Sequence, residues 1–491
     1  MMTTETGQKF IPKIKERRPD MRCFVLLFLG MMLTGCMVGP DYFRPAVSTP
    51  SAYRYEMKEV EETIDTAWWR QFGDETLEKL IFEAVSNNRD VKIAAARVEQ
   101  ATGILIQTRS PIFPQLNYGA GASRERASEQ NGSRIWSLMD NPRNAFSISA
   151  GATWEIDLWG RLRRATESAR ANLLATEEAR RGIALSMVST VATNYLQLLG
   201  LDEQLAIARQ SLKSYGDSVR LFELQFQYGH ASKMTVEQAR TRYETAAAMI
   251  PQIETQIAAI ENALSVLIGR NPGSIARGKS LHQLTLPSVP AGLPSDLLER
   301  RPDIRQAEQT LIAANAQIGA VKALYFPRLS LTAGYGQASS DLSDLFQGPA
   351  RTWSFGGSVT GPIFSAGAIS GQVRQAKAVR EVALLEYESS IQQAFSDVEN
   401  ALVSRMKLAQ QLQAQKKLVE ASREYTRLAQ LQYDGGYVPY STVLQAQEQL
   451  FPAELNFAQY RASLLASVVG IYKAMGGGWV MLADGMATGT K

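Results

Sequence analysis

Two kinds of hydrophobic periodicity follow one another along this chain. In four short segments, apolar and polar side chains alternate one by one, which is typical of β-strands. These segments are residues 116–126, 145–158, 329–337 and 352–364. Elsewhere, apolar residues recur at every third or fourth position, which predicts helices with one buried stripe. An example is the series Ile391, Phe395, Val398, Leu402 and Met406.

Two of the predicted helices are very long. Stretches without proline cover residues 160–228 and 367–434. At 1.5 Å per residue, each of them makes a helix of about 100 Å. A turn that contains Gly229 or Gly436 ends each long helix. Return helices are then predicted over residues 233–268 and 440–475.

Shorter helices precede the strands. Asp74 can cap a helix that runs to about Arg109, because an aspartate side chain accepts hydrogen bonds from the first free amides of a helix. Asp296, with Glu299 three residues later, forms the same kind of cap for a counterpart that runs to about Leu324.

The same order of elements therefore occurs twice. Phe113-Pro114-Gln115-Leu116 matches Phe326-Pro327-Arg328-Leu329 at an offset of 213 residues. After the strands the offset is 207 residues, and it pairs Gly229 with Gly436. Two copies of one unit explain both offsets, and two copies are too few for a solenoid.

The repeat sets the domain organisation that we expect. It comprises a leader (1–35), an N-terminal extension (36–75), a first repeat (76–268), a linker (269–295), a second repeat (296–475) and a tail (476–491).

Composition excludes several classes of protein. Of 491 residues, 45% are hydrophobic and 20% are charged, so the chain can bury a sizeable core. Without the leader, 46 Lys and Arg face 45 Asp and Glu, and no basic stripe indicates a nucleic-acid partner. The chain has two cysteines, Cys23 and Cys36, and two histidines, His230 and His282. These counts argue against a disulfide framework, a zinc site or a Cys/His nucleophile pair, so we expect no metal, cofactor or enzyme activity.

The N-terminus carries a secretory signal. Six basic residues precede an apolar run over 23–33, which is too short for a spanning helix. The run ends in Leu33-Thr34-Gly35-Cys36, which resembles a bacterial lipobox and predicts a lipid on Cys36. A chance apolar segment with a buried cysteine is the alternative, and either Met1 or Met21 could start the leader. No later stretch has 18 uncharged apolar residues, so we expect no membrane-spanning helix.

The strands have the length of outer-membrane spanning strands, but four of them leave two unpaired edges, which lipid does not tolerate. A barrel needs about eight strands or more. Three copies of the chain would supply twelve and leave room for a lumen. The alternative is a coiled-coil lipoprotein whose strands form a small solvent-exposed sheet.

Several motifs resemble one known family, the TolC family of outer-membrane efflux factors, in its OprM-like lipoprotein branch. They are Cys36-Met37-Val38-Gly39-Pro40-Asp41-Tyr42 with Arg44-Pro45, Trp68-Trp69 with Phe72-Gly73-Asp74, Asp157-Leu158-Trp159-Gly160-Arg161, and Leu293-Pro294-Ser295-Asp296-Leu297-Leu298 followed by Arg300-Arg301-Pro302-Asp303-Ile304-Arg305. The resemblance runs from Cys36 to Gly478, which is nearly the whole mature chain.

The resemblance implies a fold that is mainly α with a transmembrane β-barrel. It implies a homotrimer with a 12-stranded barrel and a 12-helix periplasmic α-barrel, anchored by lipid in the bacterial outer membrane. Such proteins are passive exit ducts of tripartite efflux pumps, joined to a periplasmic adaptor and an inner-membrane transporter of RND type. Small molecules are the expected cargo.

The resemblance also places a gate at the periplasmic end, at positions that align with Ser441, Gln445 and Glu448. The family has Leu, Asp and Arg there, so this chain departs at all three. In a trimer, Glu448 would form an acidic ring one helical turn from the usual one. Repulsion would loosen the ring unless cations or basic side chains relieved it. A solvated helix-face charge is the alternative for Glu448.

The two turns resemble the tips where adaptor hairpins dock, which makes Gly229, His230, Gly436 and Tyr437 candidate docking residues. Glycine there is equally explained by a left-handed helix cap, and a lone exposed histidine is commonly inert. We expect Trp68 and Trp69 to be packing anchors.

Other functions need features that the sequence does not offer. A lipid-anchored hydrolase would need a nucleophile with a base or paired carboxylates in one pocket. A structural scaffold, a duct for polypeptides and a duct for metal ions remain alternatives.

Overall fold

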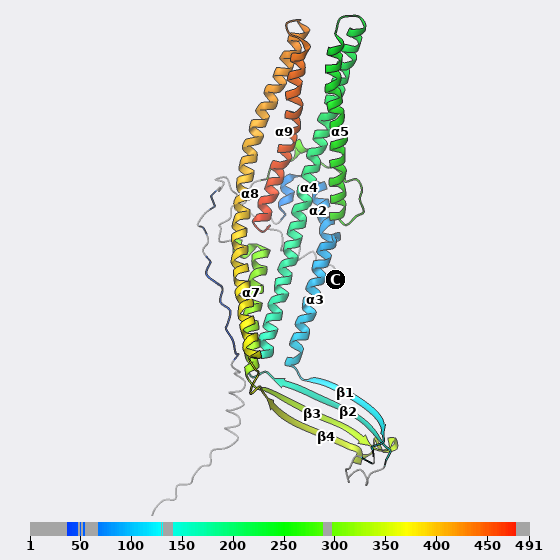
Figure 1. Cartoon of the computed structure of the whole chain (residues 1–491), viewed down its shortest axis with the longest axis vertical. Helices are drawn as coiled ribbons and strands as arrows, with labels where there is room; N and C mark the ends of the chain where they lie inside the picture. Colours follow the sequence, from blue (N-terminus) through cyan, green and yellow to red (C-terminus); the bar gives the residue numbers. More distant parts are fainter. Residues whose placement is uncertain are drawn as a thin grey trace, which may run out of the picture. The chain divides into compact units, whose positions relative to one another are not determined.

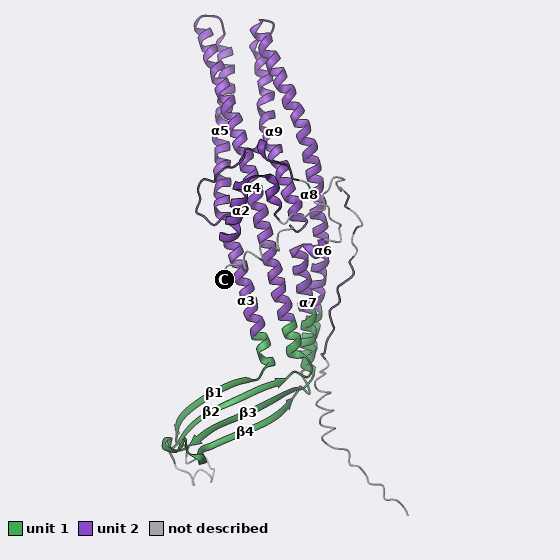
Figure 2. Cartoon of the chain, turned by 180° about the vertical axis from the view of Figure 1, so that it is seen from behind, with its two compact units in different colours: residues 1–41, 107–167, 315–377 green, residues 42–106, 168–314, 378–491 purple. Residues whose placement is uncertain are grey.

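The computed structural model describes residues 37–47, 50, 53–54, 67–128, 130, 141–287 and 297–477. They fall into two compact units, coloured separately in Figure 2. The first unit draws on residues 1–41, 107–167 and 315–377, and the second on 42–106, 168–314 and 378–491. Each unit takes segments from both repeats, so the compact units do not follow the repeat boundaries.

The first unit contains one four-stranded antiparallel sheet (Figure 1). Its strands are β1 (Gln115–Glu125), β2 (Arg143–Ile156), β3 (Arg328–Ser339) and β4 (Arg351–Thr360), in that order across the sheet. Pairing of β2 with β3 joins the two repeats, and β1 and β4 are the edges. The strands agree with the predicted segments except that β4 ends at Thr360 and not at 364. The next residue, Gly361, lies so close to Pro327 that a Cβ added to it would be 2.9 Å from the Pro327 Cα.

The two faces of the sheet differ sharply in composition. Leu331 lies between Trp154 and Gly357, and Tyr335 lies between Ala150 and Trp353, so apolar side chains share one face. The apolar residues of this face include Leu116, Tyr118, Ala120, Ile148, Ala150, Ala152, Trp154, Leu331, Ala333, Tyr335, Trp353, Phe355, Gly357 and Val359, and polar Gln337 and Arg351 share the face near one end. The opposite face, called here the small polar face, comprises Asn117, Gly119, Gly121, Ser123, Ser147, Ser149, Gly151, Thr153, Ser330, Thr332, Gly334, Gly336, Thr352, Ser354, Gly356 and Ser358.

Three pairs of helices have equal lengths in the two repeats. Helices α3 (Arg89–Arg109) and α7 (Pro302–Lys322) have 21 residues, α4 (Arg161–Gln227) and α8 (Ala368–Asp434) have 67, and α5 (Lys233–Leu267) and α9 (Tyr440–Ala474) have 35. The offset is 213 residues for the first pair and 207 for the others. The internal repeat is therefore confirmed in the structure. An 18-residue window of α4 is apolar enough to cross a membrane, but 61% of it is buried inside the chain, as in a core helix.

The helix predicted from Asp74 to Arg109 is in fact two helices, α2 (Glu75–Asn87) and α3. Asp74 is the predicted cap, since its side chain accepts hydrogen bonds from the amides of Thr76 and Leu77. The chain breaks at Asn88, whose side chain caps α3 by accepting from the amides of Asp90 and Val91. An asparagine that bonds to nearby backbone competes with helix continuation.

The counterpart helix breaks as well. Arg301 separates α6 (Leu297–Arg300) from α7, because the residue before a proline disfavours helical dihedrals and Pro302 opens the next helix. The predicted cap Asp296 lies outside the described residues.

The largest core of the second unit surrounds the tryptophan pair. Trp68 is fully buried and Trp69 nearly so, and the Trp68 ring stacks on Tyr472 with centroids 5.2 Å apart. The two residues are packing anchors, as expected. Buried Asp74 lies in the same core and accepts hydrogen bonds from the Tyr195 hydroxyl (2.9 Å) and the Lys279 amide (3.0 Å). Burial, with a smaller contribution from Asp74, raises the pKa of Tyr195.

Candidate functional site at the hairpin ends

Each long helix ends in the same tight turn, at the far ends of the hairpins α4/α5 and α8/α9 (Figure 1). Gly229 and Gly436 have φ of +76° and +74°, which side chains rarely adopt. The His230 amide bonds back to the Gln225 carbonyl, and the Tyr437 amide to the Gln432 carbonyl, both at 2.8 Å. A side chain on either glycine would meet no atom within 4 Å. The backbone therefore requires glycine at both turns, whatever docks there.

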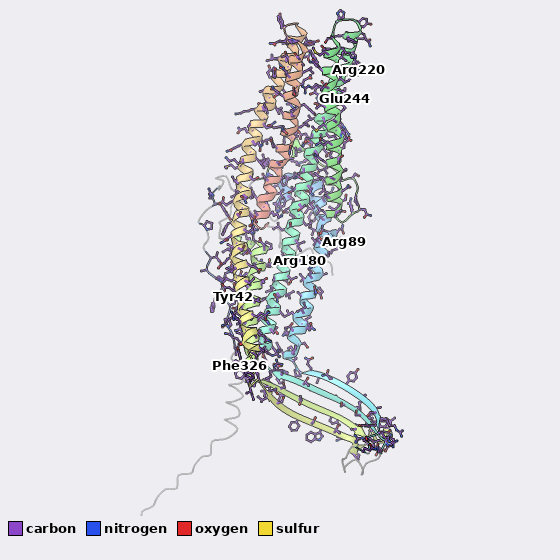
Figure 3. All side chains as sticks on the ribbon, viewed as in Figure 1. Tyr42, Arg89, Arg180, Arg220, Glu244 and Phe326 are labelled. Carbon is purple, nitrogen blue, oxygen red and sulfur yellow. The ribbon has the colours of Figure 1, made fainter. Side chains whose placement is uncertain are left out.

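The apices expose large side chains. Tyr228 is 73% exposed and Tyr437 is 85% exposed, and His230 is exposed beside the first turn. Charged side chains such as Arg220 and Glu244 lie just behind the first apex (Figure 3). The structure thus places all four predicted tip residues at the ends of the hairpins, two at each end.

An aromatic cluster holds the two hairpins together behind the turns. Phe222 of α4 is buried, and its ring centroid is 4.0 Å from that of Tyr440, at the start of α9. Tyr433 of α8 packs against both rings. Burial raises the pKa of both tyrosines. The hairpin ends are therefore packed against each other in a single copy of the chain.

The predicted gate residues lie on the first turns of α9. Ser441 is partly buried, whereas Gln445 and Glu448 are exposed. Their spacing of four and three residues places them on one face of the helix.

Glu448 is paired within the chain. Its Oε2 lies 2.6 Å from Nη2 of Arg242 on α5, and the Arg242 side chain is only 24% exposed. This pair links the return helix of one hairpin to that of the other. Arg242 is thus a basic side chain of the kind that would relieve repulsion in an acidic ring.

Sequence reasoning missed Arg242. The repeat offset of 207 residues makes Thr241 the counterpart of Glu448, so Arg242 is one residue away from the equivalent position. That proximity was the available signal. It was insufficient because the rotation of α5 about its axis decides which of two neighbours faces α9.

Other ion pairs close each hairpin on itself. Arg240 of α5 lies 2.7 Å from Glu223 of α4, and Arg423 of α8 lies 2.7 Å from Glu454 of α9. The Arg240 and Glu223 side chains are each almost half exposed, so their pair contributes little stability. The Arg242–Glu448 pair, in which the Glu448 side chain is 60% exposed, differs in that it joins one hairpin to the other.

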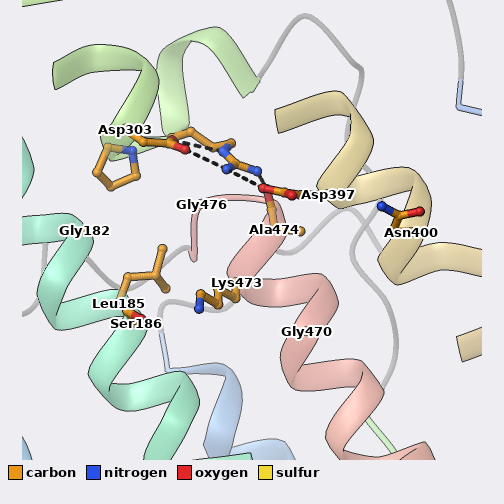
Figure 4. A pocket seen from close by; sticks show the side chains of 12 residues that line it. Gly182, Leu185, Ser186, Asp303, Asp397, Asn400, Gly470, Lys473, Ala474 and Gly476 are labelled. Atoms are coloured by element: carbon orange, nitrogen blue, oxygen red, sulfur yellow. Dashed lines mark hydrogen bonds and ion pairs between the residues drawn. The ribbon is translucent and has the colours of Figure 1, made fainter. Parts of the chain in front are cut away.

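A second polar cluster lines a cavity of about 400 Å³ among α4, α7, α8 and α9 (Figure 4). Nearly buried Arg301 lies 2.6 Å from Asp303 and 2.9 Å from Asp397, and donates to the Ala474 carbonyl. Burial lowers the pKa of Arg301, but the two carboxylates outweigh this and raise it. One guanidinium is thus shared by two carboxylates and a backbone carbonyl, so the cluster fastens α7, α8 and α9 to one another. In the described part of the chain, no group of three or more His, Cys, Asp or Glu could hold a metal ion.

Cys36, the predicted lipid site, lies outside the described residues, but the segment that follows it is fixed in the first unit. The Val38 amide donates to the Trp159 carbonyl at 3.1 Å, and Asp41 lies 2.6 Å from the buried guanidinium of Arg164. Met37 lies against Gly160, since a Cβ added to Gly160 would be 2.8 Å from the Met37 Cγ. The extension is thus held where β2 ends and α4 begins.

Comparison with known proteins gives consistent matches. The family model "Outer membrane efflux protein" matches residues 80–270 and 293–477. The solvent efflux pump outer membrane protein SrpC of Pseudomonas putida is 37% identical over 461 residues, 92% of this chain and 97% of that protein. The cation efflux system protein CusC of Escherichia coli is 35% identical over 466 residues, 93% and 99%. The Campylobacter jejuni CmeC outer membrane channel has a TM-score of 0.85 at 27% identity, covering 90% of this chain and 95% of that one.

Proposed function

Because the chain belongs to the outer membrane efflux protein family, we propose that three copies form the outer-membrane channel of a tripartite efflux pump. The trimer is a passive exit duct: a 12-stranded barrel crosses the outer membrane, and the helices extend into the periplasm. An adaptor and an inner-membrane transporter of RND type supply the connection and the energy. The duct itself carries out no chemical reaction.

The two-faced sheet is the observation that carries this proposal. In a single copy, the apolar face is open, with Trp353 69% and Phe355 80% exposed, and the edges β1 and β4 are unpaired. A lipid bilayer covers such a face favourably, and closure with neighbouring copies pairs the edges. The small polar face then lines a water-filled lumen. A solvent-exposed sheet on a scaffold would leave the same aromatic side chains in water.

The fixed N-terminal extension supports a lipid on Cys36. Met37 and Val38, which directly follow Cys36 in the sequence, are held beside the end of β2. Acyl chains on Cys36 would therefore enter the membrane that the strands span. Outer-membrane lipid is thus a further partner.

The cargo is proposed to be small molecules. Relatives of similar identity include a solvent efflux protein and a cation efflux protein, so closely similar ducts serve chemically different pumps. Cargo choice then belongs to the transporter. The tip residues Gly229, His230, Gly436 and Tyr437 are the proposed contacts with the adaptor.

The gate is proposed at Ser441, Gln445 and Glu448, with Arg242 as a fourth member. The Arg242–Glu448 pair holds α9 against α5 and so keeps the hairpin ends together in the closed duct. Rupture of the pair leaves the aromatic cluster of Phe222, Tyr433 and Tyr440 to hold the two hairpins, so their ends are loosened. Because each copy contributes one pair, three pairs would open together.

Single-channel recording in planar bilayers tests both parts of the proposal. The purified protein should conduct, and Glu448→Gln and Arg242→Gln should each raise the conductance by loosening the ends. The charge exchange Arg242→Glu with Glu448→Arg is the matched control, and it should restore a small conductance. Unchanged conductance in all variants would overturn the gate, and absence of any conductance would favour the scaffold.

A further inference from the structure

His282 lies in the linker between the two repeats, on a backbone that its neighbours hold in place. It is the middle residue of η4 (Leu281–Gln283), a single turn of 3-10 helix. Leu281 is buried in the core around the tryptophan pair. The Ser280 amide donates to Oε1 of Gln283 at 3.1 Å, and the Gln283 amide donates back to the Ser280 carbonyl at 2.9 Å. The position of the imidazole is therefore set by the turn that carries it.

The ring of His282 lies between two oppositely charged side chains that come from different repeats. Its Nε2 is 2.5 Å from Oε1 of Glu203 on α4, and its Nδ1 contacts Nη1 of Arg461 on α9. Arg461 also donates through Nη2 to the His282 carbonyl, at 3.1 Å. One imidazole thus joins the linker to a helix of the first repeat and to a helix of the second.

The chemistry of these two partners defines one protonation state of the ring. A guanidinium has donors and no acceptor, so Nδ1 accepts from Arg461 and carries no proton. The single ring proton is then on Nε2, which donates it to Glu203. Both partners are satisfied together only while the imidazole is neutral.

Protonation of the ring changes the two contacts in opposite directions. A doubly protonated imidazole has an N–H at Nδ1, so the hydrogen bond from Arg461 is lost and two like charges meet. The contact with Glu203 becomes an ion pair instead. The Glu203 side chain is 16% exposed, and among the described residues its buried Oε2 has no hydrogen-bond donor. A positively charged partner stabilises a carboxylate that has lost this much water.

The other charged side chains of the linker are engaged elsewhere. Arg277 lies 2.9 Å from Asp202 of α4 and also pairs with Glu261 of α5. Lys279 directs its Nζ toward Gly73, where an added Cβ would be 3.3 Å from it. The charged contacts of the imidazole are thus with one acid on α4 and one base on α9, and these two set its response to pH.

We propose that His282 is a pH-sensitive link between the linker and α9. At neutral pH the ring binds Glu203 and Arg461 at once. In acid it keeps Glu203 and releases the Arg461 side chain from Nδ1. An ordinary imidazole titrates at about pH 6.5, so a modest acid shift is sufficient.

The consequence for the duct rests on the proposed function, because α9 carries the proposed gate. Glu448 precedes Arg461 by 13 residues, or about 20 Å along the helix. Between them lies Pro452, which cannot donate a helical hydrogen bond. Arg242 ties α9 to α5 on one side of this proline, and His282 ties α9 to the linker on the other. Acid weakens the second tie and gives α9 more freedom about the proline.

Thermal stability at two pH values tests the link without reference to conduction. Glu203→Gln should lower the melting temperature of the full chain more at pH 5.5 than at pH 7.5, because a charged partner is then lost. Arg461→Gln should do the reverse, with the smaller loss at pH 5.5. In a His282→Gln background neither loss should depend on pH over this range, which lies above the usual carboxyl pKa values.

The matched control is His230→Gln, which removes the other histidine of the chain and should leave both pH effects as in the parent. Losses that change with pH in the same direction for the Glu203 and Arg461 variants would overturn the link. So would pH effects that persist without His282.

The ring itself provides a readout that needs no destabilised variant. Solid-state NMR of membrane-bound protein with isotope-labelled histidine should give two sets of ring nitrogen signals, and His230→Gln identifies the set of His282. At pH 7.5 the His282 ring should carry its proton on Nε2, and at pH 5.5 on both nitrogens. A neutral ring with its proton on Nδ1 would contradict the geometry.

Conductance in planar bilayers tests the effect on the duct. The parent and His230→Gln should conduct more at pH 5.5 than at pH 7.5, whereas His282→Gln should show no such rise. An equal rise in His282→Gln would refute the effect on α9. A protein that conducts at neither pH would contradict the duct, while the stability and NMR tests still decide the link.

Discussion

At the scale of single residues, Asp74 shows how one buried carboxylate serves several elements. It caps α2 and also accepts from the Tyr195 hydroxyl and the Lys279 amide. The three interactions connect α2, α4 and the linker. Sequence analysis found the cap from the residue type, but it could not find Tyr195, which is 121 residues away along the chain.

Replacing Asp74 tests this connection. Asp74→Ala removes a helix cap and leaves buried donors without an acceptor, so we expect a loss of about 3 kcal/mol in the free energy of unfolding. Tyr195→Phe is the milder control, because Asp74 keeps its bonds to backbone amides and only the bonds of the hydroxyl to Asp74 and from the Gly278 amide are lost, so the cost should be about 1–2 kcal/mol. Urea unfolding followed by circular dichroism measures both. Equal stability of Asp74→Ala and the parent would contradict the account.

Acid sensitivity is a second prediction at this scale. Burial raises the pKa of Glu261, but hydrogen bonds from Arg277 and from the Ile275 amide outweigh burial, and the pKa is lowered. A lowered pKa means that this stabilisation is complete above the usual carboxyl pKa of 4.5 and disappears as pH falls through the lower folded value.

Arg277→Gln should therefore lower the stability at neutral pH and flatten its decline in acid, so that the gap between variant and parent narrows as the pH falls below the usual carboxyl value. The unfolding midpoint in urea, followed from pH 7 to pH 3, provides the measurement. Parallel pH profiles for variant and parent would show that Arg277 does not set the pKa of Glu261.

At the scale of elements, periodicity and proline predicted most of the helices and strands, because each depends on local side-chain order. The break at Asn88 was missed because the residues on both sides of it have helical spacing, and only the side-chain hydrogen bonds to Asp90 and Val91 end α2 there. At the candidate site, glycine chemistry predicted both turns. The partner of Glu448 was not predictable, since it depends on how α5 and α9 are rotated against each other.

The turns give a prediction at this scale. Gly229→Ala and Gly436→Ala should each cost about 1–2 kcal/mol, because a non-glycine residue is disfavoured at positive φ. No steric contact adds to this cost, since the space around both positions is open. Gly470→Ala within α9 is the control and should be neutral or stabilising, because alanine favours a helix. A protease cutting at the apex reports the loosening, and equal cleavage of all three would refute it.

At the scale of the whole molecule, the sheet determines what the chain can become. Its apolar face needs lipid, its small polar face needs water, and its two free edges need other copies. Charges on the small polar side lie near the strand ends, where Arg143 pairs with Glu125 and Arg161 with Glu155. The middle of the proposed lumen is therefore neutral, which suits a duct that does not select its cargo.

Neighbouring substitutions on β4 separate the two faces. Phe355→Arg places a charge in lipid, which costs about 2–4 kcal/mol near the bilayer midplane, so insertion should fall sharply. Ser354→Arg places three charges in the lumen, so the protein should insert normally and become anion-selective. Insertion into vesicles and reversal potentials in a salt gradient measure these effects. Equal insertion of both variants would contradict the assignment of the faces.

The central claim is that three copies close one barrel, and the most direct test is the number of chains in the native particle. Native mass spectrometry of the detergent-purified protein measures it. The account predicts a particle of three chains, in which twelve strands leave no free edge. A particle of one, two or four chains would contradict it.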